Sequence, residues 1–585
     1  MKTKTILVFS PAQPIQHHAF IERKLMDFFA EEPIRRVHMG CNGVLFDLCT
    51  AQESHYIKYN SPSKEKLRIC QVCKTSRKAT WRGFEQAFLD EHISEEDKSW
   101  VNSQMKQITP ENISTFSIDG FKLGRFASYN FILRTKVHSM SSLSDASFEE
   151  FKADLRHTLF VYKGFTNYLK SNPIDLLFLY NPNYNANHVV KEVCKSKGIP
   201  FFYIHAGSSI LDMYDGLYIF DGYTYEFQNR KINYFIENVD ELNLPYSKYQ
   251  GVLNNIAHIF KGSSSWVYSQ AASSERSFDI ERAFKLDRNK PTALFSMSSI
   301  DEAFAYDFAN GNSEYIASIR KVFADQIVAL SETIRFFAKN PQWQLIVRVH
   351  PREFPNKREG KLASAVEEYN KILSDLPPNV VVNLPEDKVS IYDLFEAIHL
   401  NITSWTVTGL ESASFGIPTI STVEGLTLYP GRYVNYFPSD ATDYFDEIGR
   451  VLCKEMKRDL SLVKKSFQWY LYDHNLAVLR FSVGEFWKYR TDFFSKVSRR
   501  LKRILKLPNK SYSRYSSGFR IEDSEKKLFQ EYTRTFKPIF EQKAKFYPKE
   551  DFDSYFDKYF DGLIGILGPG TSTRLLTAEK QGMTQ

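Results

Sequence analysis

The chain has 585 residues, of which 43% are hydrophobic and 25% are charged, so it is long enough to bury the cores of two or three domains. Its formal charge of +7 and its pI near 8.7 suit a protein that meets phosphates or an anionic membrane surface. The charge is small for this length, so the composition does not indicate a nucleic-acid partner.

The N-terminal sequence shows no sign of a targeting segment. The first 18 residues hold only a short apolar run, followed by prolines and histidines, which is unlike a signal peptide. No stretch of about 18 apolar residues occurs along the chain, so the sequence predicts no helix that spans a bilayer. We therefore expect a cytoplasmic protein.

The chain opens with an α/β pattern. Residues 5–11 are apolar and end near a proline, residues 18–32 carry apolar side chains at helical spacing, and residues 35–41 resume a short strand. Residues from about 75 to 170 look mainly helical. Residues 174–208 combine an apolar run, an amphipathic helix and a second apolar run, which is a βαβ unit. Such strands predict a parallel sheet covered by helices on both faces.

Four of the six cysteines lie in this first part of the chain, at positions Cys41, Cys49, Cys70 and Cys73. The two-residue gap between Cys70 and Cys73 lets both thiolates reach one tetrahedral zinc ion, whereas the seven residues between Cys41 and Cys49 exceed the usual spacing. A reducing compartment makes disulfides improbable. Two interpretations stay open, a structural zinc on the four thiols or reduced thiols without a metal.

A second α/β series follows a serine-rich linker at about 262–290. Its predicted strands lie in 292–299, 343–350, 379–385, 399–404 and 417–422, and its predicted helices lie near 314–338, 361–375, 390–398 and 408–416. The sequence therefore predicts an α/β fold with two Rossmann-like domains that face a cleft. We expect the first domain, for the acceptor, at 1–265 with a helical insertion, and the second, for the donor, at 285–460.

After about residue 460 the pattern changes to aromatic and basic helices, so 461–585 is predicted to be a helical extension with a disordered tail. Within it, seven of the fifteen residues from 496 to 510 are Lys or Arg, with leucines, an isoleucine and a valine among them. Such a basic amphipathic segment binds an anionic membrane surface, or it packs its leucines on the body of the protein. The first interpretation makes the protein peripheral on the inner membrane face.

Polar side chains follow the predicted strands of the second domain. In parallel α/β sheets, ligands bind beyond the carboxyl ends of the strands, where helix N-termini and loop amides converge. The set is rich in hydroxyls and cations, which phosphates and sugar nucleotides require. Its members are Ser298, Ser299, Asp301, Glu302, Arg348, His350, Arg352, Pro385, Glu386, Asp387, Ser404, Thr406, Thr408 and Gly409. The alternative is that the arginines pair with protein carboxylates and that His350 caps a loop.

The stretch LIVRVHPRE at 345–353, with the segment 379–422 that contains TGLE and GIP, resembles bacterial capsule and surface-polysaccharide glycosyltransferases of the GT-B fold. The similar group includes the Kdo and sialic-acid polymer transferases, and the resemblance covers roughly residues 290–435. It implies that His350 and Pro351 contact the donor phosphate, in a pocket also lined by Ser404, Thr406 and Thr408. It also implies that Glu411 reaches the donor ribose or sugar. Relatives often carry adjacent hydroxyl residues where this chain has Thr403-Ser404-Trp405-Thr406-Val407-Thr408.

Glycosyl transfer with inversion needs a base that activates the acceptor hydroxyl. Strand-end candidates in the first domain are His17, His18, Asn181 and His205, and His205 is preferred because it directly follows an apolar strand and precedes a small-residue loop. Asp301 and Glu302 are the reserve candidates. No Asp-x-Asp pair follows a strand, so we expect chemistry without a metal or other catalytic cofactor.

The sequence thus predicts a GT-B glycosyltransferase that transfers a sugar from a nucleotide donor, CMP-linked in the favoured case, to a lipid-linked capsule, O-antigen or other surface polysaccharide. Its expected partners are the nucleotide sugar, the lipid-linked glycan and the membrane surface. The alternatives are a CDP-polyol phosphotransferase of teichoic-acid-like polymers, a sugar-nucleotide epimerase and a non-catalytic scaffold in polysaccharide assembly.

Overall fold

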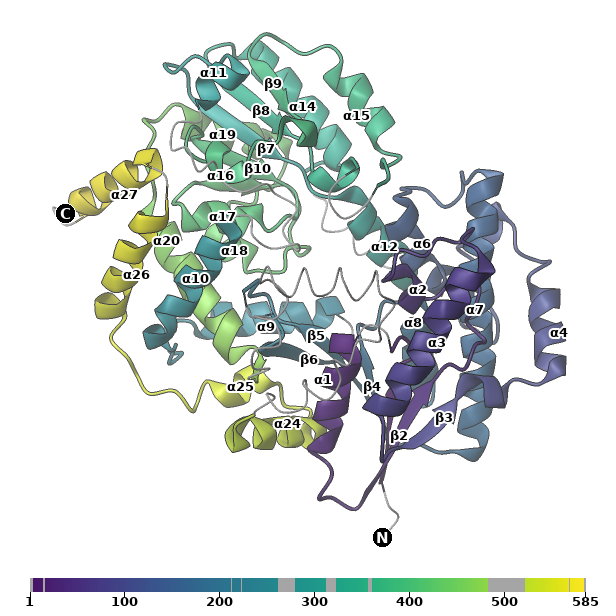
Figure 1. The fold of residues 1–585 in the computed structure, drawn as a ribbon. Coiled ribbons are helices and arrows are strands. Elements are labelled where there is room, and N and C mark those ends of the chain that lie inside the picture. Colours follow the sequence, from purple (N-terminus) through teal and green to yellow (C-terminus); the bar gives the residue numbers. More distant parts are fainter. Residues whose placement is uncertain are drawn as a thin grey trace, which may run out of the picture.

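The computed structural model describes residues 4–13, 16–211, 213–222, 224–260, 279–311, 322–355, 360–481, 521–567 and 569–582. It contains two β-sheets, one in the lower part of Figure 1 and one in the upper part, with helices around both. This is the α/β fold with two Rossmann-like units that the sequence predicts. The predicted basic segment 496–510 and most of the predicted linker lie outside the described residues.

The first sheet has seven strands in the order β12-β6-β5-β4-β1-β2-β3. Strands β1 to β5 run parallel to one another, β6 runs antiparallel to β5, and β12 runs antiparallel to β6. Their bounds are β1 Lys4–Phe9, β2 Ile34–Gly40, β3 Glu85–Phe88, β4 Leu176–Tyr180, β5 Phe201–Ala206, β6 Gly216–Asp221 and β12 Leu479–Arg480. Strand β4 is apolar throughout and β1 is apolar after Lys4 and Thr5, because both faces of the sheet are covered.

Different helices cover the two faces of the first sheet. On one face, α1 (Gln16–Asp27) and α24 (Asp523–Thr535) pack against Val8, Phe178 and Phe202. On the other face, α7 (Asp145–Ser171) and α8 (Asn185–Ser196) pack against Leu7, Leu177 and Tyr203. The segment of about 75–170, predicted to be mainly helical, also contains α4 Glu95–Gln104, α5 Leu123–Phe126 and α6 Ser128–Thr135, together with strand β3. Before it lie α2 Thr50–Glu53 and α3 Ser63–Thr80, of which only the end of α3 falls within the predicted segment.

The second sheet has five parallel strands in the order β11-β10-β7-β8-β9. Its strands are β7 Thr292–Ser296, β8 Gln344–Arg348, β9 Val380–Asn383, β10 Leu400–Thr403 and β11 Thr419–Ser421, which confirms all five predicted strands. The helices of this unit are α11 Ile280–Phe284, α12 Ile300–Asn310, α14 Gln326–Lys339, α15 Val366–Leu373, α16 Ile391–Leu394, α17 Thr408–Ser414, α18 Gly431–Val434 and α19 Ala441–Leu452. Helix α12 was not predicted.

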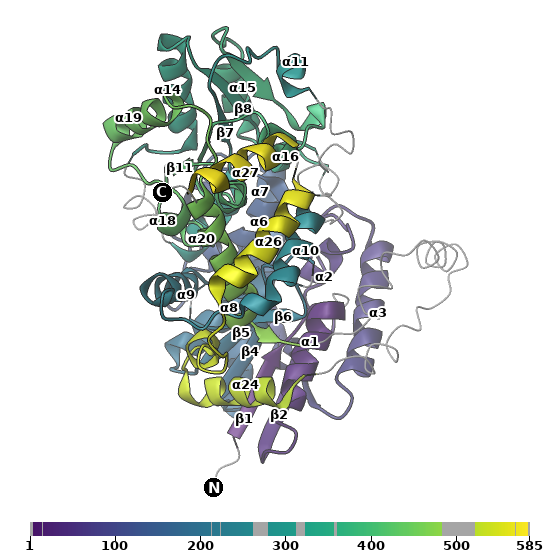
Figure 2. The ribbon, with the colours of Figure 1, turned by 90° about the vertical axis from the view of Figure 1, so that its left-hand side faces the viewer.

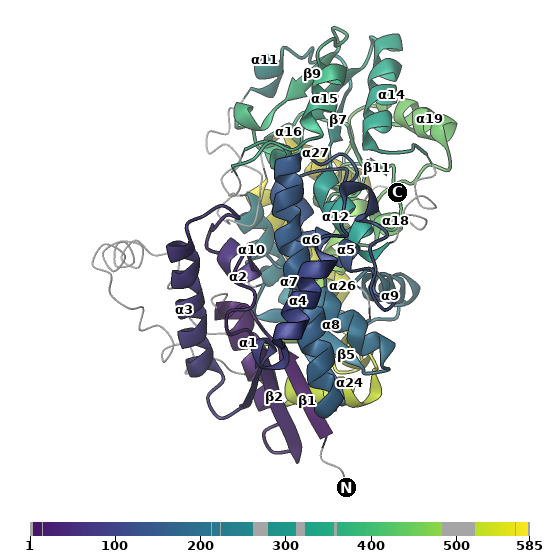
Figure 3. The same cartoon turned by 90° about the vertical axis from the view of Figure 1, so that its right-hand side faces the viewer.

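The two units are joined by helix packing. Helix α12 leaves the second sheet and lies along α6 of the first unit, as Figures 1 and 3 show. At its far end, a Cβ on Gly311 would lie 2.3 Å from Nη1 of Arg125, and the left-handed φ of +70° at Gly311 also favours glycine there. One apolar cluster runs from Leu7 of the first unit to Leu410 of the second, so the two units share a core.

The C-terminal part of the chain returns to the first unit. Helix α20 (Leu460–Leu471) continues into a π-helical turn, η6 (Tyr472–Leu476), and β12 then pairs with β6. The remaining helices are α25 Ile539–Lys543, α26 Phe552–Ile566 and α27 Pro569–Gly582; α26 packs on α10 (Tyr249–Phe260), as Figure 2 shows. None of the helices in the described ranges combines the length and apolarity that a bilayer crossing requires.

Candidate functional site

Both sheets reverse their strand order at one point, between β1 and β4 in the first sheet and between β7 and β10 in the second. In open α/β sheets such a switch point, at the carboxyl ends of the strands, is where ligands bind. Helix α6 lies between the two edges: the N–H of Asn130 donates to Asn185, just after β4, over 3.1 Å, and the carbonyl of Leu133 accepts from Arg352, after β8, over 3.0 Å. The carboxyl edges of both sheets therefore meet α6.

Hydroxyl groups line the switch point of the second sheet. Ser296 at the end of β7 shares a hydrogen bond of 3.1 Å with Thr408, the first residue of α17. The backbone N–H of Trp405 donates to Ser298 over 3.1 Å. These contacts bring the residues after β7 and β10 together, as the sequence predicts.

The predicted hydroxyl residues differ in solvent exposure, and this difference shows which of them a ligand can reach. Ser404 is completely buried and shares a hydrogen bond of 3.0 Å with Thr422, and Ser298 and Ser299 are also buried. Thr406 and Thr408 are only partly buried. A ligand at this edge can therefore reach the last two hydroxyls, while Ser404 supports the loop from below.

Gly409 follows Thr408 and allows a close approach by a tyrosine. A Cβ at this position would lie 2.1 Å from the hydroxyl oxygen of Tyr429, so every other residue would displace that ring. Tyr429 is buried and lies near the carbonyl of Thr406. The glycine thus fixes the loop that carries the two accessible hydroxyls.

Arg348 ends β8 and points into the protein. Its guanidinium donates to Asn383 at the end of β9 and to the carbonyl of Val389 over 3.0 Å. Burial lowers the pKa of Arg348 to about 10, against nearby Tyr392 and carboxylates that include Glu411. Burial raises the pKa of Glu411 to about 7, although Tyr392 donates to this carboxyl group and Arg348 lies near it. The guanidinium of Arg348 and the carboxyl group of Glu411 therefore lie near each other and near Tyr392.

His350 caps the short helix that starts at Pro351 (Pro351–Glu353). Its Nδ1 accepts from the backbone N–H of Arg352 over 3.2 Å. Burial lowers its pKa to about 3, with Arg352 and Arg348 adding to the effect and Asp301 opposing it. The imidazole is therefore neutral at pH 7, and because Nδ1 is the acceptor, the single ring proton sits on Nε2. Such a ring is a neutral hydrogen-bond donor.

Arg352 holds the second unit against the first. It is buried, donates from Nε to both oxygens of Asp301 over 3.0 and 3.1 Å, and donates from Nη2 to the carbonyl of Leu133. Lys136 of the first unit donates in turn to the carbonyls of Arg352 and Lys361. Glu302 lies 3.6 Å from Arg352, with 51% of its side chain exposed. Of the two reserve carboxylates, only Glu302 is accessible.

His205, the preferred base, lies next to the exit of β5 and is exposed. Its Nδ1 lies 2.9 Å from the carbonyl oxygen of Ala206, and because a carbonyl only accepts, Nδ1 carries the proton and Nε2 keeps its lone pair. Desolvation lowers the pKa of His205 against the opposing hydrogen bond with Ala206, which favours the neutral ring. Its tautomer is the opposite of that of His350.

The other first-unit candidates lie nearby. His18 stacks on Tyr180 with ring centroids 3.6 Å apart, and the ring of Tyr180 lies 6.0 Å from that of His205. Asn181 adopts a left-handed φ of 53° and accepts from the N–H of Asn183 over 3.0 Å, so it shapes the turn after β4. The side chain of His17 lies outside the described residues.

A cavity of about 50 Å³ lies beside the switch point of the first sheet. Its walls come from the residues after β1, β2 and β4, from α2, α3 and α7, and include Pro11, Ala12, Leu48, Glu53, Asn130, Asp154, His157 and Asn185. The polar side of this cavity was not predicted from the sequence, because Glu53, Asn130, Asp154 and Asn185 lie on helices rather than at strand ends.

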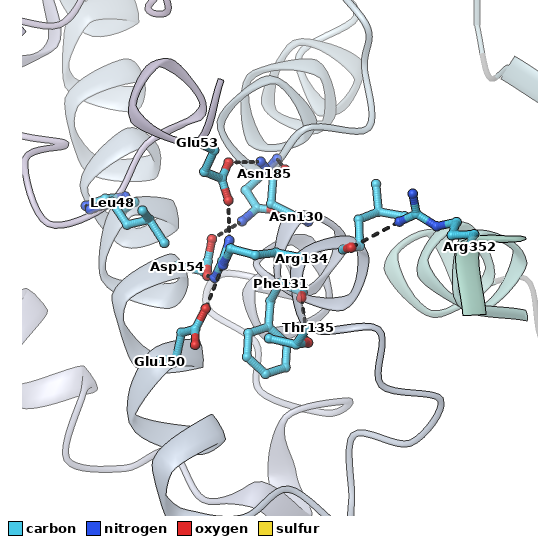
Figure 4. A network of polar contacts seen from close by, with 12 residues as sticks. Leu48, Glu53, Asn130, Phe131, Arg134, Thr135, Glu150, Asp154, Asn185 and Arg352 are labelled. Atoms are coloured by element: carbon cyan, nitrogen blue, oxygen red, sulfur yellow. Dashed lines mark hydrogen bonds and ion pairs between the residues drawn. The ribbon is translucent and has the colours of Figure 1, made fainter. Parts of the chain in front are cut away.

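Arg134 organises the polar wall of this cavity, as Figure 4 shows. Its guanidinium contacts Glu53, Glu150 over 2.7 Å and Asp154 over 2.5 Å. Asn185 donates to Asp154 over 2.8 Å. Burial, with two further carboxylates close by, raises the pKa of Asp154 to about 7 against the opposing effect of Arg134. Glu150 and Asp154 are four residues apart on α7, which was the only sequence signal for the network.

All four clustered cysteines, Cys41, Cys49, Cys70 and Cys73, line the same cavity. Burial raises the pKa of Cys41 to about 12 and that of Cys73 to about 11, so the thiols are protonated at neutral pH. Within the described ranges, no three His, Cys, Asp or Glu side chains are arranged to hold one metal ion. The structural zinc stays a prediction.

No protein-family model and no curated protein matches the chain. Among solved structures, it is similar to UDP-GlcNAc 2-epimerase from Neisseria meningitidis bound to UDP-GlcNAc, at 10% identity and a TM-score of 0.26 over 80% of this chain and 96% of that one. The KpsC β-Kdo 2,4-transferase of Thermosulfurimonas dismutans gives 13% identity and a TM-score of 0.30 over 51% and 79%. The glycotransferase of kitacinnamycin gives 10% identity and a TM-score of 0.23 over 81% of this chain and 96% of that one. Likenesses this distant say nothing about activity.

Proposed function

We propose that the protein is a glycosyltransferase that moves a sugar from a nucleotide donor, CMP-linked in the favoured case, to a lipid-linked surface polysaccharide. The donor binds at the second sheet and the acceptor at the first. The observation that carries the proposal is the hydrogen bonding of two histidines at the carboxyl edges of the two sheets. Nδ1 of His350 accepts from the N–H of Arg352, which assigns the proton to Nε2, and Nδ1 of His205 bonds to the carbonyl of Ala206, which leaves the lone pair on Nε2.

At the second sheet, the departing nucleotide phosphate gains negative charge as the bond to the sugar breaks. Nε2–H of His350 and the accessible hydroxyls of Thr406 and Thr408 are neutral donors fixed by the fold, and preorganised donors of this kind stabilise developing charge. Arg348 and Arg352 act indirectly, because their guanidinium groups hold the loops on which these donors stand.

At the first sheet, Nε2 of His205 accepts the proton of the acceptor hydroxyl while that oxygen bonds to the anomeric carbon. A neutral imidazole suits this step, because its lone pair is available at the pH of the cytoplasm. Asp301 is engaged by Arg352 and positions it, whereas exposed Glu302 is the reserve base.

A nucleotide panel tests donor binding without knowledge of the acceptor. A ligand that binds only the folded protein at a hundredfold excess over Kd adds about 2.7 kcal/mol of stability. We expect CMP or CDP to raise Tm, and His350→Ala to abolish the rise. His55→Ala is the matched control, because His55 is exposed and bonds only within its own turn. A chain whose Tm ignores CMP, CDP, UMP and UDP would instead be a scaffold.

Mass spectrometry of the product then separates the two transferase chemistries. Incubation with a CMP-sugar and a synthetic lipid-linked acceptor should add the mass of one sugar residue. Addition of a polyol phosphate from a CDP-polyol would show the phosphotransferase instead. The predicted membrane segment 496–510 is tested separately, by sedimentation of the full chain with anionic and with neutral vesicles.

A further inference from the structure

The π-helical turn η6 places a charged residue beneath the loop that follows His205. Asp473 is 3% exposed and lies in this turn, which connects α20 to the edge strand β12. Turns of this type are uncommon and occur frequently at functional sites. The C-terminal part of the chain thus delivers a buried carboxylate to the first sheet.

Asp473 accepts three hydrogen bonds. Its Oδ2 accepts from the hydroxyl of Ser208, and its Oδ1 accepts from the hydroxyl of Tyr218 over 2.7 Å and from Nζ of Lys231 over 2.6 Å. Ser208 stands three residues after His205, and Tyr218 is the residue directly opposite His205 on the neighbouring strand. One carboxylate therefore holds both flanks of the histidine.

The loop between these flanks has little freedom. The N–H of Gly207 contacts the carbonyls of Met213 and Gly216, each at 2.8 Å, and a Cβ on Gly207 would lie 2.5 Å from the carbonyl of Gly216. The peptide that supplies this N–H also carries the Ala206 carbonyl that accepts from His205. The orientation of this one peptide plane therefore fixes the tautomer of the imidazole.

We infer that Asp473 is a positioning residue for His205: by holding Ser208 and Tyr218, it sets the Ala206–Gly207 peptide that keeps the proton on Nδ1 and the lone pair on Nε2. The catalytic consequence rests on the proposed function, in which His205 is the base. The effect of Asp473 on the tautomer of His205 does not depend on the proposed function.

The charge of Asp473 is part of this arrangement. Burial alone would raise its pKa, but Lys231, with help from His474 and from the hydrogen bonds of Lys231 and Ser208, lowers it below its usual value. Lys231 lies over the rings of Tyr218 and Trp469, at 4.3 and 5.2 Å from their centroids. The carboxylate is therefore ionised and accepts strong hydrogen bonds.

Nitrogen NMR of the full chain, labelled with ¹⁵N-histidine, reads the tautomer directly. His205→Gln identifies the signals of His205 among those of the 13 histidines. In the wild type we expect a protonated Nδ1 and an unprotonated Nε2. In Asp473→Asn and in the milder Ser208→Ala we expect a mixture of tautomers. Ser209→Ala is the matched control, because Ser209 lies in the same loop and contacts Asn255 rather than Asp473.

Kinetics with the donor and acceptor then measure the consequence for the reaction. Ser208→Ala should lower kcat on the order of tenfold to a hundredfold, part of what a general base supplies, and leave KM for the donor unchanged. Wild-type tautomer signals in folded Ser208→Ala and Asp473→Asn would overturn the inference. Absence of any nucleotide effect on the wild type would overturn the proposed function instead, so the two failures are distinguishable.

Discussion

The two sheets share one strand order around their switch points, yet different chemistry occupies each point. In the first sheet, Glu22 accepts from Ser10 after β1 and receives a backbone hydrogen bond from Tyr180 at the end of β4. In the second, Ser296 and Thr408 take the corresponding place with hydroxyls. Glu22 is buried and already bonded to Ser10, whereas Thr408 keeps a partly exposed hydroxyl, so the side chains favour the second switch point for a phosphate ligand.

The largest expected loss of stability comes from replacing Arg134. This residue pairs with three carboxylates in the first unit, and the second switch point has no counterpart described above. Arg134→Met leaves Glu53, Glu150 and Asp154 without their cation, and loss of one partner from a buried ion-pair network costs about 3–5 kcal/mol. Chemical denaturation measures this loss. Lys98→Met, at an exposed pair with Glu95, should cost less than about 0.5 kcal/mol, and equal losses in both variants would contradict the assignment.

The buried carboxyl group of Glu22 makes the stability of the folded protein depend on pH. Burial raises its pKa from 4.5 to about 8, so the folded chain holds a proton that the unfolded chain releases above pH 4.5. The stability from this group is complete below pH 4.5 and is lost as the pH rises to 8. Glu22→Gln removes this loss.

We therefore expect Glu22→Gln to gain stability relative to the wild type as the pH rises from 4.5 to 8, by on the order of 4–5 kcal/mol in total. Glu353 and Glu411, whose pKa values burial raises to about 7, remain in both proteins and cancel in the difference. Denaturation midpoints across this range supply the test. A constant difference between the two proteins would mean that Glu22 is ionised in the fold.

The second switch point yields a smaller effect, on ligand binding. Thr408→Val removes an accessible hydroxyl and should weaken nucleotide binding by about tenfold, the value of one hydrogen bond to a charged group. Ser404→Ala should cost about 1 kcal/mol of stability and leave nucleotide affinity unchanged, because Ser404 is buried against Thr422. Calorimetric titration with CMP measures the nucleotide affinity of both variants. Weaker binding in Ser404→Ala alone would reverse the assignment.

The sequence predicts the second sheet well because each of its strands is a compact apolar run. In the first sheet it misses β6, and it also misses β3, whose four residues include two polar ones, and β12, whose two residues are a strand only through pairing with β6. The polar edge of the second sheet was also predictable from position. The inward direction of Arg348 was not, because its partner Asn383 lies 35 residues away.

The first-unit site was still harder to foresee. Arg134 meets Glu53 across 81 residues and meets α7 only through the packing of α6. No periodicity or motif in the sequence indicates such a long-range ion pair, since each partner alone resembles an ordinary charged residue on a helix. The same holds for Asp473, which lies 265 residues from Ser208.

The smallest expected change is that caused by a chelator. One experiment with EDTA tests both the donor site and the cysteine cluster. Under the proposed function, His350, Thr406 and Thr408 offset the charge of the leaving phosphate without a metal ion, so turnover should persist in EDTA. At the first, the zinc prediction requires a lower Tm in EDTA with the CMP-induced rise retained, because the four thiols lie away from the donor hydroxyls. Loss of turnover that magnesium or manganese restores would place a metal at the second edge and remove the role given to His350.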